Sequence, residues 1–331
     1  MEKPDPKILL VWIGRIGDLL VSTPFISGLR QKYPEADITL LLREYTRETG
    51  EAVPGVNRVI TLPSVKRPAS FLEFLSGYAF RKFDLCLDLN AAYSRTSGML
   101  CLMSGAKRRV SFEKFRAEKF YTETAPRPDD KAHFSDRYRL LAGHFGFDCG
   151  NQMRLAPAPQ ARTKADEKAR EFDITTTSFN VCVHPGNFRK REHRWPEENF
   201  IALTKLLLAE PDVRVFYFSG PGEDAHVIKM LKSLPAGRIT LIKAMNPAVW
   251  AALMTRFDIM IVNATATMHI AAAMDVPFLG FHSGYSWRCW RPLTGLCDNI
   301  NSGDWDSCRI IPVEMAHQKY AALKTQILAR K

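Results

Sequence analysis

An acidic side chain follows two glycines near the start of the chain, where it could do chemistry. Gly14, Gly17 and Asp18 come directly after an apolar run at residues 7–12. Glycines in such a turn let the backbone approach a ligand closely. At the carboxyl end of a strand, the Asp18 carboxylate could act as a general base that takes a proton from an attacking hydroxyl. Asp is also a favoured N-cap residue, and the spacing alone favours the cap. The spacing is not that of a dinucleotide fingerprint.

Three later segments contain the residue types that bind phosphate and ribose. Residues 184–196 combine a glycine with a dense set of cations, and backbone amides and Arg or Lys side chains bind anions well in such a loop. In residues 219–223, the Glu223 carboxylate could accept hydrogen bonds from ribose hydroxyls, or simply favour the dipole of the following helix. The small residues of 263–269 suit a pyrophosphate, while His269 among them is explained equally well by core packing.

Apolar, β-branched runs alternate with helical patterns along most of the chain. Such alternation predicts parallel sheets with helices on both faces, which is an α/β fold of doubly wound, Rossmann-like units. Strands are predicted at residues 7–12, 37–42, 57–62, 83–87, 108–112, 178–183, 213–218, 239–242, 258–262 and 277–281. Helices are predicted at residues 18–32, 133–147, 196–209, 223–234, 265–274 and 313–328.

The alternation stops once and then restarts, which predicts two domains. The chain has 331 residues, more than one average core supports, and the prolines in residues 155–164 indicate a linker. We predict a first domain at residues 1–157, a second at 165–311, and a terminal helix at 312–331 that packs back on the first domain. Ligands of open parallel sheets bind at the carboxyl ends of the strands, so the predicted site is a central cleft that both domains face.

The composition is that of an ordinary globular protein with an excess of positive charge. The formal net charge of +11 favours an anionic partner such as phosphates, acidic sugars or a negative membrane surface, although a basic protein without such a partner can have the same composition. We find no membrane-spanning run, no signal-peptide pattern and no nucleic-acid-binding motif, and we expect a cytoplasmic protein. Seven cysteines without C-x-x-C spacing argue against a disulfide framework and a zinc site.

Taken in order, these segments resemble glycosyltransferase family 9, the ADP-heptose:lipopolysaccharide heptosyltransferases, over nearly the whole chain. The segments that carry the resemblance are Ile8-Leu9-Leu10-Val11, Gly17-Asp18-Leu19-Leu20 with Thr23-Pro24, His184-Pro185-Gly186, Arg194-Trp195-Pro196, Gly220 to Glu223, Thr265 with Met268-His269-Ile270-Ala271-Ala272-Ala273, and Val276-Pro277. The resemblance implies a GT-B fold whose first domain binds the acceptor and whose second binds the donor. It also implies inverting transfer of heptose from ADP-heptose to a lipopolysaccharide core, with no metal and no cofactor, by an enzyme peripheral to the cytoplasmic face of the inner membrane.

The resemblance assigns roles to individual residues. Asp18 matches the family's catalytic base, Glu223 its ribose-binding acid and Met245 a residue at the adenine. Arg194, helped by Lys190 or Arg191, would offset the charge of the departing diphosphate. The predicted donor-binding residues, from the loops and the resemblance together, are Gly17, His184, Gly186, Asn187, Lys190, Glu223, Met245, Asn263, Thr265, Ala266 and His269. The predicted acceptor-binding residues, each of which could equally be a solvated surface residue, are Lys66, Arg67, Arg116 and Arg137.

The chain departs from the family pattern at His193-Arg194, where the family has a Lys just before Trp-Pro, and at two positions of a later segment. In the family's D-[TS]-G-x-x-H segment, this chain has Ala264 and Ala266 in place of the Asp and the Gly. The missing Asp would hydrogen-bond the donor sugar, and losing a charged hydrogen bond typically costs about 1.5–3 kcal/mol. Asn263 could compensate only if the loop rotates. Two alternatives stay open: a family 9 transferase that uses another nucleotide sugar on a surface glycan, and a catalytically weak homologue that binds a nucleotide or a glycan.

Overall fold

The chain folds as two units, Met1–Ala156 and Pro157–Lys331. The computed structural model describes residues 6–63, 70, 72, 74, 78, 81–186, 188, 193–235 and 237–331. Each unit has its own sheet and its own buried core, and the two are described one at a time.

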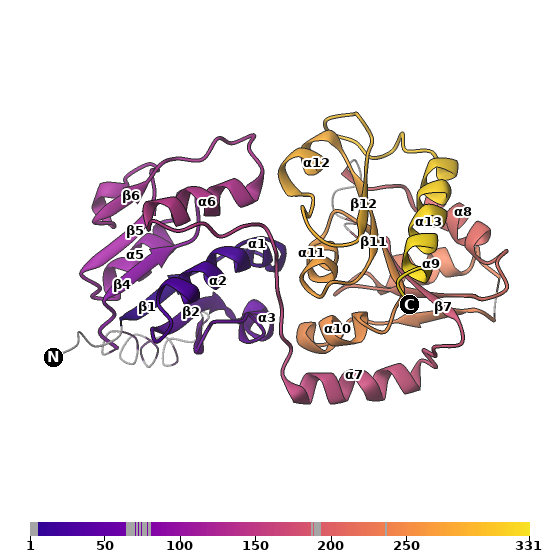
Figure 1. The fold of residues 1–331 in the computed structure, drawn as a ribbon, viewed down its shortest axis with the longest axis horizontal. Helices are drawn as coiled ribbons and strands as arrows, with labels where there is room; N and C mark the ends of the chain where they lie inside the picture. Colours follow the sequence, from indigo (N-terminus) through magenta and orange to yellow (C-terminus); the bar gives the residue numbers. More distant parts are fainter. Residues whose placement is uncertain are drawn as a thin grey trace. The chain divides into compact units, whose positions relative to one another are not determined.

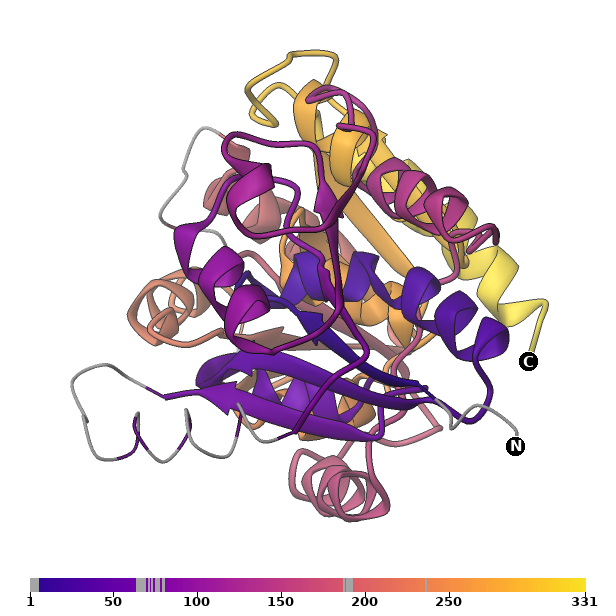
Figure 2. The ribbon, with the colours of Figure 1, turned by 90° about the vertical axis from the view of Figure 1, so that its left-hand side faces the viewer.

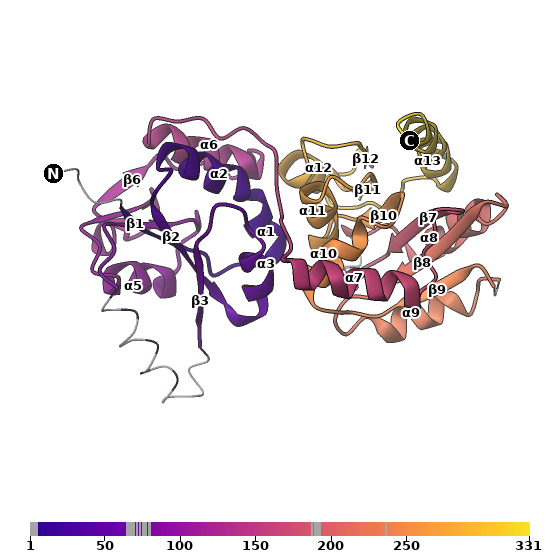
Figure 3. The same cartoon turned by 60° about the horizontal axis from the view of Figure 1, so that its bottom comes forward.

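The first unit is built on a parallel sheet with helices on both faces (Figure 1). Within the described residues its strands are β1 (Lys7–Val11), β2 (Asp37–Arg43), β3 (Arg58–Leu62), β4 (Leu85–Asp88), β5 (Arg108–Phe112) and β6 (Glu123–Ala125), in the order β3-β2-β1-β4-β5-β6. The described helices are α1 (Ile16–Val21), α2 (Thr23–Lys32), α3 (Arg47–Glu51), α5 (Arg95–Met103) and α6 (Phe134–His144), with short 3-10 helices at Glu44–Thr46 and Ala117–Lys119. The strands fan out with the usual twist (Figure 2). Helices α2 and α6 cover one face of this sheet and α5 covers the other (Figure 3).

The second unit repeats this topology. Its described strands are β7 (Phe179–His184), β8 (Val213–Phe218), β9 (Ile239–Ile242), β10 (Ile259–Asn263), β11 (Phe278–His282) and β12 (Cys297–Asn301), in the order β12-β11-β10-β7-β8-β9. The described helices are α7 (Pro159–Glu171), α8 (Glu197–Leu207), α9 (Asp224–Leu231), α10 (Pro247–Met254), α11 (Ala266–Ala273), α12 (Gly284–Trp290) and α13 (Val313–Leu328). If the strands of each unit are counted from its own first strand, both sheets have the order 3-2-1-4-5-6 of a Rossmann fold. The prediction of two tandem doubly wound units is confirmed.

The central strands form because they are apolar on both faces. Ile8–Val11 in β1 is fully buried, and every residue of β7 and β10 is buried as well. A parallel sheet covered by helices on both sides requires such continuous apolar runs, whereas a half-exposed strand would alternate. The register is parallel throughout, with Val11 of β1 opposite Leu41 of β2 on one side and Asp88 of β4 on the other. The carboxyl ends of these strands therefore meet at one edge of each sheet.

The helix predicted at residues 18–32 is instead two helices, α1 and α2, that meet at Ser22. Pro24 lacks a backbone N–H, so it cannot bond the carbonyl of Leu20 as an uninterrupted helix would require. The hydroxyl of Thr23 donates to that carbonyl at 2.7 Å, and the Ser22 hydroxyl donates to the carbonyl of Leu19 at 2.6 Å. Two buried side chains thus satisfy the carbonyls that the break leaves open.

Three further segments differ from the predictions. The proline-rich stretch predicted as a linker contains the start of α7, because Pro159 takes the first helical position, where no N–H is needed. The irregular segment after β5 contains the short edge strand β6, which pairs with Val110 to Phe112. The polar sequence of β12, which pairs with β11, was not predicted as a strand because its five residues include two Asn and an Asp.

The terminal helix α13, which was predicted to pack back on the first domain, is grouped with the second unit. It packs on α8, and Tyr320, Leu323 and Ile327 lie in the same buried cluster as the strands β7 and β8. The Tyr320 ring makes an edge-to-face contact with the ring of Phe179 in β7, with ring centroids 6.3 Å apart. The apolar stripe of this helix is therefore used within the unit that precedes it.

Two absences can be stated for the described part of the chain. None of its helices has the length and apolar character needed to cross a membrane. Its seven cysteines are all free thiols, including Cys297 and Cys308.

Replacing Leu323 with Ala tests the position of α13. We expect the free energy of unfolding of the second unit to fall by about 2–5 kcal/mol, because a buried Leu is lost and a cavity is left. The matched control is Leu328→Ala on the same helix, where the side chain is half exposed and the change should stay within about 0.5 kcal/mol. Urea denaturation followed by fluorescence measures both. Equal effects of the two substitutions would show that the helix does not complete this core.

Candidate active site

Asp18 lies in the first turn of α1, at the carboxyl end of β1. The N-cap is Arg15 rather than Asp18, so the capping interpretation of the sequence is wrong in detail. The Asp18 carboxylate instead accepts a hydrogen bond from the backbone N–H of Arg15, as the third residue of a helix does in a capping box. Burial raises the pKa of this carboxyl from 3.8 to about 6, and the positive charges of Arg15 and Arg137 offset only part of that rise. Asp18 is therefore an acid of unusually high proton affinity, held in a fixed position.

The turn before Asp18 is fixed by close packing. A Cβ atom on Gly14 would lie 2.2 Å from the ring of Trp12, so only glycine fits there. The Trp12 indole N–H donates to the carbonyl of Arg15 at 3.2 Å, and the Tyr45 hydroxyl donates to the carbonyl of Gly14 at 2.7 Å. Gly17 is buried inside the first turn of α1. Gly14 therefore allows the backbone to pack against the Trp12 ring, and Gly17 allows the first turn of α1 to be buried.

Arg137, a predicted acceptor-binding residue, is the positive charge that the fold brings to Asp18. It lies on α6, and its guanidinium is one of the two charges that lower the pKa of Asp18. The guanidinium carbon is 4.1 Å from the ring centroid of Phe134, and the buried Nε has no hydrogen-bond partner among the described residues. A buried guanidinium N–H without a partner is costly, so an anionic ligand at this point would be stabilised.

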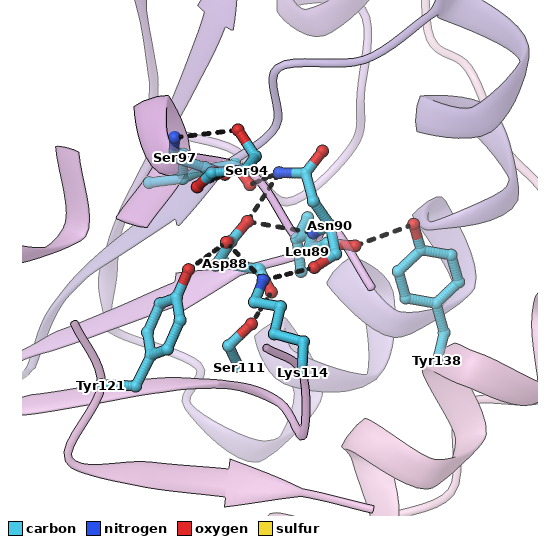
Figure 4. A network of polar contacts seen from close by, with 10 residues as sticks. Asp88, Leu89, Asn90, Ser94, Ser97, Ser111, Lys114, Tyr121 and Tyr138 are labelled. Carbon is cyan, nitrogen blue, oxygen red and sulfur yellow. Dashed lines mark hydrogen bonds and ion pairs between the residues drawn. The ribbon is translucent and has the colours of Figure 1, made fainter. Parts of the chain in front are cut away.

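A second carboxylate at the same edge was missed by the sequence interpretation. Asp88 is the last residue of β4 and is fully buried (Figure 4). It accepts hydrogen bonds from Tyr121 Oη at 2.5 Å, from Lys114 Nζ at 2.8 Å, and from both the backbone and side-chain N–H groups of Asn90 at 3.0 and 2.6 Å. The signal was available, because an Asp that directly ends an apolar run must be buried with its charge paired.

The Asp88 network joins two loops of the first unit. Lys114 Nζ bonds both Asp88 and the carbonyl of Asn90 at 2.7 Å, and it lies 4.9 Å from the Tyr121 ring centroid. Burial and the charge of Asp88 raise the pKa of Tyr121, so its hydroxyl stays protonated and donates. The loop after β4 and the loop after β5 are thereby held to the same carboxylate. Arg116, a predicted acceptor-binding residue, lies on the second of these loops, while Lys66 and Arg67 lie outside the described residues.

In the second unit, His184 and Glu223 come together at the carboxyl edge. His184 ends β7 and Glu223 is the N-cap of α9. The His184 Nε2 atom and a Glu223 carboxylate oxygen are 3.1 Å apart, and that carboxylate also accepts the backbone N–H of Gly220 at 2.9 Å. On its other side, His184 Nδ1 lies 3.4 Å from the Thr265 hydroxyl. Three loops predicted separately to bind the donor are therefore linked through one histidine ring.

Two glycines make room for this cluster. A Cβ atom on Gly186 would lie 2.5 Å from the His184 ring, and one on Gly220 would lie 2.8 Å from a Glu223 carboxylate oxygen. Neither position shows a positive φ. These glycines are required for space, because the histidine ring and the carboxylate lie directly against the backbone.

Asn263 holds the loop that follows β7. It is fully buried, and its carbonyl oxygen accepts the backbone N–H of Trp195 at 2.8 Å. Its amide donates to the carbonyls of Pro185 and Gly186 at 2.9 and 3.4 Å. The side chain thus ties both ends of the 185–195 loop to β10. Both polar atoms of the Asn263 side chain therefore have hydrogen-bond partners within the second unit.

Arg194 is buried and paired. One guanidinium nitrogen donates to Glu197 at 2.7 Å, and the guanidinium carbon lies 4.7 Å from the ring centroid of Phe188, which in turn stacks on His226. The other terminal nitrogen is buried with no hydrogen-bond partner among the residues that are described. Arg194 lines a cavity of about 530 Å³ between the starts of α8 and α9, together with Lys229. Asn187, Lys190 and Arg191 lie outside the described residues.

The remaining predicted donor residues lie at the starts of helices or just after strands. Thr265 is the N-cap of α11 and makes no capping hydrogen bond with its side chain, while Ala266 is the first helical residue. His269 is buried one turn further along, 6.4 Å from Trp290 between ring centroids. Met245, half buried, follows β9. Among the described residues, no group of three or more His, Cys, Asp or Glu side chains is arranged to hold a metal ion.

The family model described as glycosyltransferase family 9 (heptosyltransferase) matches residues 79–309, which is more than half of the chain. The chain belongs to glycosyltransferase family 9. It is 24% identical to lipopolysaccharide heptosyltransferase 3 of Escherichia coli over 303 residues, which cover 87% of each protein.

Solved structures show the same fold. The glycosyl transferase family 9 structure from Veillonella parvula matches with a TM-score of 0.86 and 18% identity, covering 98% of this chain and 99% of that one. The E. coli ADP-heptose lps heptosyltransferase II matches with a TM-score of 0.78 and 19% identity, covering 97% of this chain and 99% of that one. The GT-B fold class predicted from the sequence is thus confirmed, and membership of the family makes this family 9 protein a glycosyltransferase.

Replacing Asn263 with Ala tests its role as a scaffold. Removing the amide leaves the Trp195 N–H and the Pro185 carbonyl buried without partners, so the free energy of unfolding of the second unit should fall by about 2–4 kcal/mol. The control Asn301→Ala removes an exposed amide with one hydrogen bond and should cost far less. Thermal denaturation and calorimetric binding of ADP are the two measurements. A variant that is as stable as the parent but loses ADP binding would show that Asn263 is a ligand contact instead.

Replacing Asp18 with Asn should stabilise the first unit at neutral pH. The folded protein holds an ionised, partly buried carboxylate above pH 6, whereas the unfolded chain ionises near pH 3.8, so ionisation favours the unfolded state between these values. The stability gained by Asp18→Asn should therefore be absent below pH 4, grow between pH 4 and 6, and be constant above pH 6. Denaturation midpoints over this range, with Glu35→Gln at an exposed site as control, provide the test. A gain that decreases with rising pH would contradict the raised pKa.

Proposed function

We propose that this family 9 enzyme transfers a heptose from ADP-heptose to the core of a lipopolysaccharide acceptor, with inversion at the anomeric carbon and without a metal ion or a separate cofactor. The observation that carries the proposal is Asp18, a carboxylate at the carboxyl edge of the first sheet whose pKa is raised to about 6. Such a group is ionised at neutral pH but retains a high proton affinity, which is what a general base for a hydroxyl needs. The likeness to lipopolysaccharide heptosyltransferase 3 and to the E. coli ADP-heptose lps heptosyltransferase II supports the choice of donor and acceptor.

In this proposal the first unit binds the acceptor. Asp18 takes the proton from the acceptor hydroxyl, whose oxygen then attacks the anomeric carbon of the donor as the bond to the diphosphate breaks. Arg137 presents an N–H that has no partner among the described residues to an acidic group of the acceptor, and Arg116 adds a second cation from the loop after β5. The excess of positive charge supports an anionic glycolipid as the acceptor and a peripheral position at the cytoplasmic face of the inner membrane.

The second unit binds the nucleotide sugar. Glu223 and His184 form a polar pair packed against Gly186 and Gly220, and their side chains are suited to hydrogen bonds with the ribose and the diphosphate. The free amides at the start of α11, next to Thr265, suit the diphosphate. Arg194 is already paired with Glu197, so it offsets the charge of the departing diphosphate mainly through its unpartnered nitrogen.

One observation favours a second candidate, a family member that binds a nucleotide with little turnover. The family Asp is replaced by Ala264, and the neighbouring Asn263 is committed to Trp195 and Pro185, so it does not replace the missing hydrogen bond to the donor sugar. A third possibility keeps the chemistry and changes the donor to another nucleotide sugar. Incubating the protein with a panel of nucleotide sugars and lipopolysaccharide acceptors, with products read by mass spectrometry, separates the three. Tight calorimetric binding of ADP with no product from any pair would favour the weak homologue.

The rate of transfer should follow the ionisation of Asp18. With the donor at a fixed concentration and the acceptor varied, kcat/KM for the acceptor should rise tenfold per pH unit below pH 6 and level off above it, because only the ionised carboxylate accepts the proton. Asp18→Asn should lower kcat by about 10²–10⁴-fold while the affinity for ADP is unchanged. The control is Asp306→Asn, an exposed acid in the second unit, which should leave kcat unchanged. Near-normal turnover of Asp18→Asn would remove Asp18 from the mechanism.

A further inference from the structure

Two exposed aromatic side chains touch each other at the carboxyl edge of the first sheet. Tyr93, in the loop after β4, is 41% exposed, and Phe115, in the loop after β5, is 66% exposed. Their ring centroids are 5.5 Å apart at an interplanar angle of 73°, an edge-to-face contact. The guanidinium carbon of Arg116 lies 4.7 Å from the Phe115 ring centroid. Single exposed apolar residues are ordinary, but a braced aromatic pair with a cation on a loop points to a ligand.

We propose that Tyr93, Phe115 and Arg116 form a platform that binds an anionic sugar residue of the acceptor, at a distance from the hydroxyl that reacts. The proposal rests on the proposed function, since it concerns the acceptor of that reaction. It adds two aromatic residues that neither the sequence nor the family match had assigned to the site.

The chemistry of the three side chains fits an acidic saccharide. One face of a pyranose ring carries C–H bonds whose hydrogens are slightly positive, and these pack against the negative face of an aromatic ring. The planar guanidinium of Arg116 can bond a carboxylate or phosphate with two parallel N–H groups. Phe115 supplies the apolar face, Tyr93 braces it and adds a hydroxyl, and Arg116 selects for negative charge.

The buried Asp88 network holds the platform in shape. Lys114, next to Phe115 in the chain, bonds Asp88 at 2.8 Å and the carbonyl of Asn90, which precedes Tyr93 by three residues. The same ion pair therefore fixes both loops that carry the aromatic rings, and both partners are almost fully buried. Arg116 has a left-handed backbone with φ of 56°, which is uncommon for a residue other than glycine and is retained chiefly at functional positions. A preformed platform does not have to be ordered when the ligand binds.

The topology places the platform and Asp18 at the same edge of the first sheet, beyond different strands. The strands β1, β4 and β5 are neighbours in the first sheet, and Asp18, Tyr93 and Phe115 each follow the carboxyl end of one of them. Adjacent strands are about 4.8 Å apart, so the ends of β1 and β5 are separated by roughly 10 Å. This is the scale of an oligosaccharide segment rather than of one hydroxyl. The platform therefore contacts a neighbouring residue of the acceptor glycan and contributes to acceptor affinity, not to proton transfer.

Calorimetric titration of the full chain with deacylated lipopolysaccharide core oligosaccharide tests the proposal. We expect Tyr93→Ala and Phe115→Ala each to raise the Kd by about tenfold, the upper range for loss of an aromatic contact. The matched control is Met99→Ala, an apolar side chain of similar exposure (39%) on α5, which should leave the Kd unchanged. Arg116→Gly keeps the left-handed backbone and removes the cation, so it should weaken binding and reduce the dependence of the Kd on salt. Melting temperatures confirm that these surface variants are folded.

Three outcomes would overturn the platform. The first is a Kd within twofold of the parent for both aromatic variants. The second is no binding of the oligosaccharide by the parent chain. The third concerns vesicles that contain phosphatidylglycerol: if binding to them depends on Tyr93 and Phe115 while oligosaccharide binding does not, the pair is a membrane contact.

The proposed function fails separately. A chain that binds the oligosaccharide through these residues but transfers no sugar would refute the transferase and keep the platform. If both aromatic variants transfer heptose with an unchanged acceptor KM, the platform is refuted and the transferase is kept.

Discussion

In a parallel sheet that is covered on both faces, a strand can accommodate a polar side chain only at its ends. In each unit, one such side chain holds the neighbouring loops in place through hydrogen bonds. In the first unit it is Asp88, whose four hydrogen bonds draw Lys114, Tyr121 and Asn90 to the end of β4. In the second it is Asn263, which joins both ends of the 185–195 loop to β10. Neither side chain could lose a partner cheaply, since an orphaned buried polar group costs about 1–3 kcal/mol. The loops that bear the candidate ligand contacts are therefore rigid where they leave the sheet.

Two carboxylates at the edge of the first sheet show how environment separates structure from reactivity. Asp88 is the more deeply buried, but a lysine and three further donors stabilise its charge. Asp18 has a single backbone N–H and the more distant charges of Arg15 and Arg137, so desolvation dominates and its pKa rises to about 6. The two carboxylates thus differ in their hydrogen-bond and ionic partners. Those of Asp88 hold two loops together, whereas Asp18 has few partners and a raised pKa.

The sequence allowed the strands and the sheet class to be predicted because buried parallel strands are continuous apolar runs, as in Ile8–Val11. It did not predict the break at Ser22, where the Thr23 hydroxyl donates to the Leu20 carbonyl because Pro24 has no N–H to donate. It also did not predict β12, whose polar residues form a strand by pairing with β11. Asp18 was identifiable from its position and the family pattern. The Asp88 network depends on contacts between loops distant in sequence, which no local spacing reveals. The ion pair of Arg194 with Glu197 joins residues three positions apart at the start of α8, and the sequence interpretation missed it.

Under the proposed function, Ala264, where the family pattern has an Asp, would affect only the sugar end of the donor. The pair of His184 and Glu223, the glycines packed against it and the Asn263 bonds to the 185–195 loop form a self-contained scaffold that does not involve residue 264. The amides that begin α11 are likewise independent of the side chain at that position. The groups suited to a ribose and a diphosphate are thus intact, while the acidic contact expected at the sugar is gone. Under the proposed function, a change at this residue would therefore act on which sugar is accepted and how fast it is transferred, rather than on recognition of the nucleotide.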